Sequence, residues 1–259
     1  MAARRGRAPE YRASDERDEE VRSVDVEIWS DVVCPWCYVG KRQFEAALDQ
    51  FAHADQVTVA WRSFELDPSS PPEVGMSMDL ILQRKYGMSE EQARMANERM
   101  TSLAGELGLE YHLDRARAGN TFDAHRLIHL AATHGLGDAV KERLFAAYFT
   151  EGRSIGDRAI LTAVAEEAGL DRAEVEATLE GEAFADEVRA DEARAAALGA
   201  TGVPFFVIDE TYGVAGAQGD AVLLAALERA WSESHPITMV DSPGKGPDDG
   251  ACADGVCAV

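Results

Sequence analysis

The chain has strand-like segments only near its two ends, and a long middle stretch without them separates the two groups. Four short segments show the alternation or apolar enrichment that is typical of strands. They are residues 24–30, 57–66, 203–209 and 211–217. Residues 77–198 are rich in Ala, Glu, Arg and Leu, and their glycine breaks predict five to seven helices. We therefore expect an α/β fold: a four-stranded sheet with a large all-helical insertion between the second and third strands.

The same patterns predict domain boundaries. Residues 24–75 and 200–232 are expected to form the sheet-containing domain, and residues 76–199 the helical insertion. Residues 1–23 hold six Arg and six acidic residues and no apolar stretch of the kind found in signal peptides, so we expect a disordered leader. Residues 233–259 are rich in Pro, Gly and Asp and are expected to form a flexible tail.

The charge balance limits the partners of the protein. Lys and Arg total 25 against 47 Asp and Glu, which gives a formal net charge of −22 at pH 7. Such a surface repels phosphate backbones and anionic bilayers. The sequence also has no apolar run of membrane-spanning length. We therefore predict a cytoplasmic protein that binds neither nucleic acid nor membrane.

The four cysteines lie in two close pairs. Cys34 and Cys37 form C-P-W-C directly after the first predicted strand, where a helical pattern begins, and Cys252 and Cys257 lie in the last eight residues. Four cysteines are too few for a secreted scaffold held together by disulfides. Their positions are therefore more informative than their number.

The C-P-W-C sequence has the placement that thiol–disulfide exchange requires. Pro35 suits the first turn of a helix, and an exposed Cys34 sulfur there would meet unpaired N–H groups and the positive end of the helix dipole. Both effects favour a thiolate, which attacks disulfides. We predict that Cys34 attacks and Cys37 resolves the mixed disulfide. This chemistry requires no bound organic cofactor.

A zinc site is the alternative for the cysteines. Four thiolates from Cys34, Cys37, Cys252 and Cys257 would suit tetrahedral Zn²⁺. Structural zinc cysteines usually lie on knuckle turns, however, whereas the first pair follows a strand and begins a helix. The redox interpretation is favoured, and no metal is predicted.

Four segments resemble the DsbA-like thioredoxin-fold proteins, in particular the FrnE-like group. They are IWSDVVCPWCYVGKRQFE, WRSFELDP, NTFDAHRLIHLA and TGVPFFVID, which lie between residues 28 and 209. The resemblance covers about residues 24–231. The resemblance implies a thioredoxin-like fold and a thiol–disulfide oxidoreductase that reduces, isomerises or oxidises disulfides. The partners that we expect are disulfide-containing proteins or peptides and a thiol reductant, such as a low-molecular-weight thiol or thioredoxin.

The resemblance also implies a substrate-binding site at Val203 and Pro204. In this fold the peptide bond before that proline is cis, the proline faces the active site, and the preceding residue pairs with an extended substrate. The active-site loop residues Pro35 and Trp36 differ from the Pro-His pair of the familiar periplasmic oxidant, which leaves the redox potential open. In a reducing cytosol we expect reduction or isomerisation rather than net oxidation.

FrnE-like proteins can carry an extra cysteine pair near the C-terminus. Our hypothesis is that Cys252 and Cys257 exchange electrons with the active site. The alternative is an incidental, exposed and dispensable pair.

Other polar residues have weaker signals. His125 and His129 are four residues apart and could ligate a metal from one helix face, but no H-E-x-x-H pattern accompanies them, and helix-surface or core histidines are favoured. Asp31 is either a partly buried acid that tunes the thiols or a plain turn residue. Trp61 and Phe64 are expected to pack in the core.

Two other functions are compatible with this architecture. One is a glutathione-dependent isomerase that resembles 2-hydroxychromene-2-carboxylate isomerase and the kappa glutathione transferases, which usually carry serine at the attacking position. The Cys-x-x-Cys pattern of this chain favours redox chemistry instead. The other is a non-enzymatic binding module that uses an apolar groove of the helical region.

Overall fold

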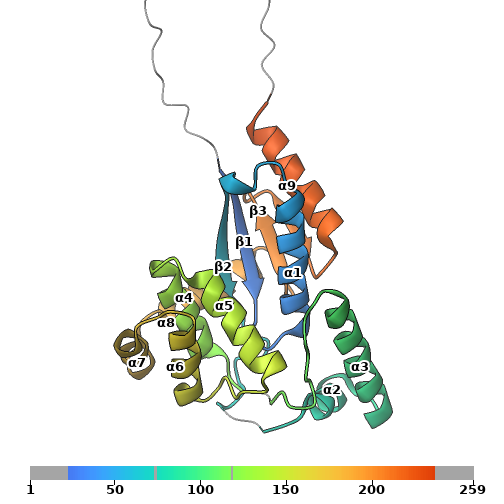
Figure 1. Ribbon diagram of the computed structural model, residues 1–259, viewed down its shortest axis with the longest axis vertical. Helices are drawn as coiled ribbons and strands as arrows, with labels where there is room; N and C mark the ends of the chain where they lie inside the picture. The colour runs from blue at the N-terminus through green and yellow to red at the C-terminus, as the bar shows by residue number, and fades with distance from the viewer. Residues whose placement is uncertain (1–22, 73–74, 118, 237–259) are drawn as a thin grey trace, which may run out of the picture.

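The computed structural model describes residues 23–72, 75–117 and 119–236, and its four strands form one sheet in the order β2-β1-β3-β4 (Figure 1). The strands are β1 (Val24–Ser30), β2 (Val57–Ser63), β3 (Phe205–Ile208) and β4 (Tyr212–Ala215). β1 is parallel to β2 and antiparallel to β3, and β3 and β4 form an antiparallel hairpin. The predicted split sheet is confirmed.

The helices divide in the same way. The sheet-containing part carries α1 (Pro35–Gln50), the short 3-10 helix η1 (Ala54–Gln56) and α9 (Asp220–Ser234). The insertion carries α2 (Met78–Tyr86), α3 (Glu90–Glu106), α4 (Phe122–Thr133), α5 (Gly137–Phe145), the π-helical turn η2 (Ala146–Thr150), α6 (Arg158–Glu167), α7 (Arg172–Glu180) and α8 (Ala185–Ala197). Apart from one isolated bridge between Ser77 and Arg117, the described residues of the insertion form no β-structure. The all-helical insertion is therefore confirmed.

The sheet is covered on both faces because successive strand residues point to opposite sides. Val26 and Ile28 pack with Phe44 of α1 and with the apolar residues of α9. Trp29 points the other way and packs with Ala195 of α8. Its indole Nε1 donates a hydrogen bond to the carbonyl oxygen of Asp191 at 2.9 Å. The last helix of the insertion thus belongs to the packing of the sheet.

The insertion lies at the end of the sheet where β1 ends and α1 begins, whereas β1 starts and α9 ends at the opposite end (Figure 1). The largest apolar cluster joins the two parts: it contains Cys34 and Cys37 together with apolar residues of α4, α5, η2 and α6. The first turn of α1 is therefore enclosed by the insertion.

Most of the predicted leader and tail lies outside the described residues. Residues 1–22 of the leader and residues 237–259 of the tail, with Cys252 and Cys257, are not described. None of the described helices combines the length and the apolar character that crossing a bilayer requires.

Candidate active site

The C-P-W-C sequence forms the N-terminus of α1, as the sequence predicted. Cys34 is the N-cap residue and Pro35 follows in the first turn, where its missing N–H costs no hydrogen bond. The Cys34 N–H donates to the carbonyl of Asp31 at 3.1 Å, and the Cys37 N–H donates to the carbonyl of Cys34 at 3.0 Å. The loop after β1 thus turns directly into the helix and places both sulfurs at its start.

Both cysteines are thiols, and both are buried. Cys34 is 5% exposed and Cys37 is 1% exposed, whereas Trp36 between them is 46% exposed. The expectation of an exposed Cys34 was therefore wrong. The insertion packs over the first turn of α1, a long-range contact that the local sequence does not encode.

Val203 and Pro204 lie beside the first cysteine. The peptide bond between them is cis, as the resemblance implied. The Cys34 thiol donates to the Val203 carbonyl, with 3.5 Å between sulfur and oxygen. Within the described residues, the Val203 amide nitrogen donates no hydrogen bond. This residue therefore has an unused backbone donor next to the dithiol.

Gly40 allows α1 to approach Pro204 closely. A Cβ atom at this position would lie 2.8 Å from Pro204 Cγ and 3.4 Å from the ring of Phe206. Real Cβ atoms do not approach other atoms so closely. Because Gly40, one turn after Cys37, has no side chain, α1 and Pro204 can lie in direct contact.

Sequence reasoning did not single out Tyr111, which approaches the dithiol from the segment between α3 and α4. Its hydroxyl donates to the carbonyl of Pro35 at 2.8 Å. Its ring stacks on Phe149 with 4.7 Å between centroids and lies 6.0 Å from Tyr38. Burial raises the pKa of Tyr111 far above its usual range. No local pattern marks a tyrosine in a loop as an active-site neighbour.

Sequence reasoning also missed Lys141 on α5. The side chain is fully buried, and its Nζ donates to the carbonyl of Ser30 at 3.3 Å. The ammonium lies 5.1 Å from the ring centre of Phe145 and 5.5 Å from that of Trp61. Among the described residues no carboxylate forms a salt bridge with Lys141, although the Asp31 carboxylate is close enough to act on its charge. Burial lowers the pKa of Lys141 to about 8.

Asp31 and His125 form a second buried polar pair near the cysteines. One Asp31 oxygen accepts a hydrogen bond from the Leu66 N–H at 2.7 Å, and the other lies 3.4 Å from His125 Nε2 without a well-formed hydrogen bond. Asp31 is thus a buried acid that also begins the turn before α1, since its carbonyl accepts the Cys34 N–H. Its tuning of the thiols stays a prediction. His125 is a core histidine, as expected.

His129 lies on the same helix as His125 but has different partners. Its Nε2 lies 3.0 Å from Ser63 Oγ and 3.1 Å from an Asp191 carboxylate oxygen. Among the residues that the structure describes, no group of three or more His, Cys, Asp or Glu side chains is arranged to hold a metal ion. The zinc alternative needs Cys252 and Cys257, which lie outside these residues.

The Cys37 thiol has a strongly perturbed pKa. Burial raises it well above the usual value, and the neighbouring Cys34 raises it further. The charge of Lys141 and a backbone hydrogen bond from Asp31 act in the opposite direction. Cys37 therefore holds its proton at neutral pH unless its surroundings change.

Trp61 and Phe64 pack against apolar clusters, as expected for core residues. The Trp61 indole also donates to an Asp138 carboxylate oxygen at 3.2 Å.

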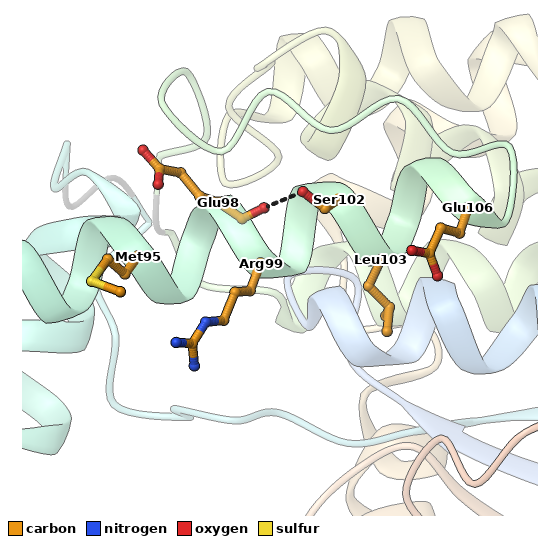
Figure 2. A pocket seen from close by; sticks show the side chains of 6 residues that line it. All are labelled: Met95, Glu98, Arg99, Ser102, Leu103 and Glu106. Carbon is orange, nitrogen blue, oxygen red and sulfur yellow. Dashed lines mark hydrogen bonds between the residues drawn. The ribbon is translucent and has the colours of Figure 1, made fainter.

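A shallow depression of about 380 Å³ lies along α3, and Figure 2 shows the side chains that line it. They are Met95, Glu98, Arg99, Ser102, Leu103 and Glu106. All six come from one helix, and neither cysteine is among them. The dithiol therefore does not lie in this depression.

The split sheet, the dithiol at the start of α1 and the cis-proline beside it define a thioredoxin-like protein with a helical insertion. Residues 25–228 match the DSBA-like thioredoxin domain. The chain belongs to this family.

The chain is similar to three known proteins. It is 48% identical to a probable DsbA oxidoreductase from Streptomyces coelicolor, whose crystal structure gives a TM-score of 0.79 over 87% of this chain and 97% of that one. It is 33% identical over 207 residues to the uncharacterized protein YwbO of Bacillus subtilis, over 79% of this chain and 96% of YwbO. The cytosolic disulfide reductase DsbM from Pseudomonas aeruginosa shares the fold, with 20% identity and a TM-score of 0.57 over 81% of this chain and 99% of DsbM.

Proposed function

We propose that the protein is a thiol–disulfide oxidoreductase that acts through Cys34 and Cys37. The observation that carries this proposal is the position of the Cys34 sulfur, at the N-terminus of α1 and 3.5 Å from the Val203 carbonyl. A sulfur at a helix N-terminus is stabilised as a thiolate by the unpaired N–H groups and the helix dipole. Membership of the DsbA-like family supports the same chemistry.

The two cysteines have different roles in the proposed reaction. The Cys34 thiolate attacks a substrate disulfide, a Cys34–substrate bond forms, and the first substrate sulfur leaves and takes up a proton. Cys37 then loses its proton and attacks Cys34. The Cys34–Cys37 disulfide forms as the second substrate sulfur leaves and is protonated. The substrate gains two electrons, and the enzyme dithiol loses them.

The backbone at Val203 is the proposed docking point for the substrate. Its amide nitrogen has no hydrogen-bond partner among the described residues, and its carbonyl is already beside Cys34. An extended peptide that pairs with this backbone would hold its own disulfide next to Cys34 by strand addition. Disulfide-containing proteins and peptides are therefore the substrates that we propose.

We propose disulfide reduction or isomerisation as the direction of the reaction, in the cytoplasm. A low-molecular-weight thiol such as glutathione, or thioredoxin, would return the enzyme to its dithiol form by two thiol–disulfide exchanges. The fold is shared with DsbM, a cytosolic disulfide reductase for which a structure with GSH is known. We also propose that the chain belongs to the FrnE-like group.

The glutathione-dependent isomerase has less support from the site. Proteins of that kind usually carry serine at the attacking position, and here both positions carry thiols at the start of α1. A second thiol has no role in the glutathione-dependent isomerase reaction, but it is needed to resolve a mixed disulfide.

The decisive experiment is a redox titration of Cys34 and Cys37 against glutathione buffers of known potential. A variant with Cys252→Ser and Cys257→Ser isolates the pair, and alkylation followed by mass measurement reports the dithiol fraction. We expect a reversible two-electron transition. Comparison of its midpoint potential with the potential of cytosolic glutathione gives the direction of electron flow. Failure to form a disulfide between the two residues would refute the proposed function.

The tail cysteines are tested by the same titration in the full chain. If Cys252 and Cys257 exchange electrons with the active site, the native protein turns over faster than the double serine variant. Equal turnover and an equal active-site midpoint in both proteins would show that the tail pair is incidental.

A further inference from the structure

We propose that Lys141 is the buried counter-charge that allows Cys37 to ionise when it resolves the mixed disulfide. This inference rests on the proposed function. It assigns a role in the reaction to a helix of the insertion, outside the part of the chain that carries the cysteines.

The packing around Lys141 gives no structural reason for a charged side chain at this position. Its Nζ contacts the carbonyl oxygen of Ser30 and lies over two aromatic rings, and it makes no salt bridge among the described residues. The Asp31 carboxylate is close enough to raise its pKa. Burying an ammonium group without a carboxylate partner is strongly unfavourable. An apolar side chain of similar length would pack there without this cost. Because Asp31 forms no salt bridge with it, the Lys141 ammonium has no direct counter-ion among the described residues of the resting structure.

The other buried lysine of the same region shows the contrast. Lys41 on α1 is 2% exposed, but its Nζ lies 3.2 Å from Asp138 and 3.1 Å from Glu142 and also bonds Glu45. These three carboxylates compensate the charge of Lys41. Lys141 has no such partner among the described residues, so the two lysines form a matched pair for experiment.

The contacts of Lys141 place it at the start of α1: its Nζ bonds the Ser30 carbonyl, and the carbonyl of the next residue accepts the Cys34 N–H at 3.1 Å. The ring of Phe145, under the ammonium, packs in the same apolar cluster as both cysteines. Asp31 approaches from the loop after β1, with His125 of α4 beside it, and Cys34, Cys37 and Lys41 approach from α1. Negative charge on Cys37, Asp31 and Cys34 raises the pKa of Lys141 against the effect of burial. The Lys141 charge in turn lowers the pKa of Cys37. Lys141 and Cys37 thus stabilise each other only when both are charged.

This coupling matters at one step. Once Cys34 is bonded to the substrate sulfur it carries no charge, and Cys37 must give up its proton in a buried site. The Lys141 ammonium stabilises the thiolate that forms there. Cys37 then bonds to Cys34, the Cys34–substrate bond breaks, and the departing sulfur takes the electron pair and a proton.

Ellman's reagent separates the two steps, because the first thiolate product is released when Cys34 attacks and the second when Cys37 resolves the mixed disulfide. We compare three proteins in the Cys252→Ser, Cys257→Ser background: the parent, Lys141→Met and Lys41→Met. In Lys141→Met we expect the second release at neutral pH to slow by about threefold for a rise of one in the pKa of Cys37, because the tenfold loss of thiolate is partly offset by the higher nucleophilicity of a more basic thiolate. The pH midpoint of the second release should rise, and the first release should change much less.

The controls separate an electrostatic role from a structural one. Lys41→Met should leave the ratio of the two release rates unchanged, and Lys141→Arg, which keeps the charge, should resolve faster than Lys141→Met. Circular dichroism establishes that each variant is folded. A second release in Lys141→Met as fast as in the parent, or an equal slowing of both releases, would overturn the inference and leave the proposed function intact. If the parent itself releases no second product, the proposed function fails instead.

Discussion

The two parts of the molecule contribute different kinds of group to the same dithiol. The sheet-containing part supplies the sulfurs of Cys34 and Cys37 and the backbone at Val203 and Pro204. The insertion supplies side chains: the Tyr111 hydroxyl on the Pro35 carbonyl and the buried ammonium of Lys141. The reacting atoms are thus positioned by one part, and their ionisation is influenced by the other.

The largest expected effect is on the side of the sheet-containing part. Cys34→Ser should reduce disulfide reductase activity by roughly a thousandfold or more, because the nucleophile is lost. Cys37→Ser should still form the mixed disulfide and accumulate it. Insulin reduction measures the first effect, and mass spectrometry of the trapped adduct measures the second. Substantial activity in Cys34→Ser would place the nucleophile elsewhere.

On the side of the insertion, removing a charge should stabilise the fold. The pKa of Lys141 falls from 10.5 to about 8, so its burial opposes folding by up to about 3 kcal/mol. The native state releases this proton before the unfolded state does, so the penalty is full below pH 8 and disappears as the pH rises from 8 to 10.5. Lys141→Met should therefore raise the free energy of unfolding at pH 7.

Urea unfolding of both proteins between pH 7 and 10 measures this effect. The stability difference between Lys141→Met and the parent should shrink steadily above pH 8. A difference that is independent of pH would mean that Lys141 does not change its ionisation on folding.

Adding one methyl group at the contact between α1 and Pro204 should lower the free energy of unfolding. Gly40→Ala places a Cβ atom 2.8 Å from Pro204 Cγ, and overpacking of this kind costs about 1–3 kcal/mol. The matched control is Gly105→Ala in α3, where nothing lies within 4 Å of the new atom and stability should rise by about 0.5–1 kcal/mol. Equal effects of the two substitutions on urea unfolding would contradict the close contact.

The smallest expected effect concerns Tyr111. Tyr111→Phe removes the hydrogen bond to the Pro35 carbonyl and should lower the free energy of unfolding by about 1 kcal/mol. Tyr86→Phe on the exposed surface of α2 is the control and should have no measurable effect. A Tyr111→Phe variant as stable as its control would show that the insertion holds the active-site loop through packing alone.

The sequence predicted the sheet-containing part well because its signals are local. Alternation identified β1 over its full length, and the C-P-W-C sequence next to a helical pattern located the start of α1. Val203 and Pro204 followed from the resemblance, not from any pattern of their own. β3 is shorter than predicted: its ladder begins at Phe205, immediately after Pro204, which has no N–H to donate.

The contribution of the insertion could not be predicted in the same way. Helical periodicity shows that α5 has a buried face, but a lysine there looks like a solvent-facing residue until the partner of that face is known. The burial of Cys34 was missed for the same reason, because the residues that cover it lie far along the chain. Asp31 precedes the motif directly, but only the fold shows that it is buried beside His125.

The split sheet also has a consequence for the newly made chain. Cys34 and Val203 are 169 residues apart, so at about 5–20 residues per second the sulfur is synthesised roughly ten to thirty seconds before the carbonyl that it contacts. Pairing of β1 with β3 must wait until β3 has been synthesised. During that interval the nascent polypeptide carries the cysteine pair without its finished active site, and premature exchange with other disulfides is a hazard of this chain order.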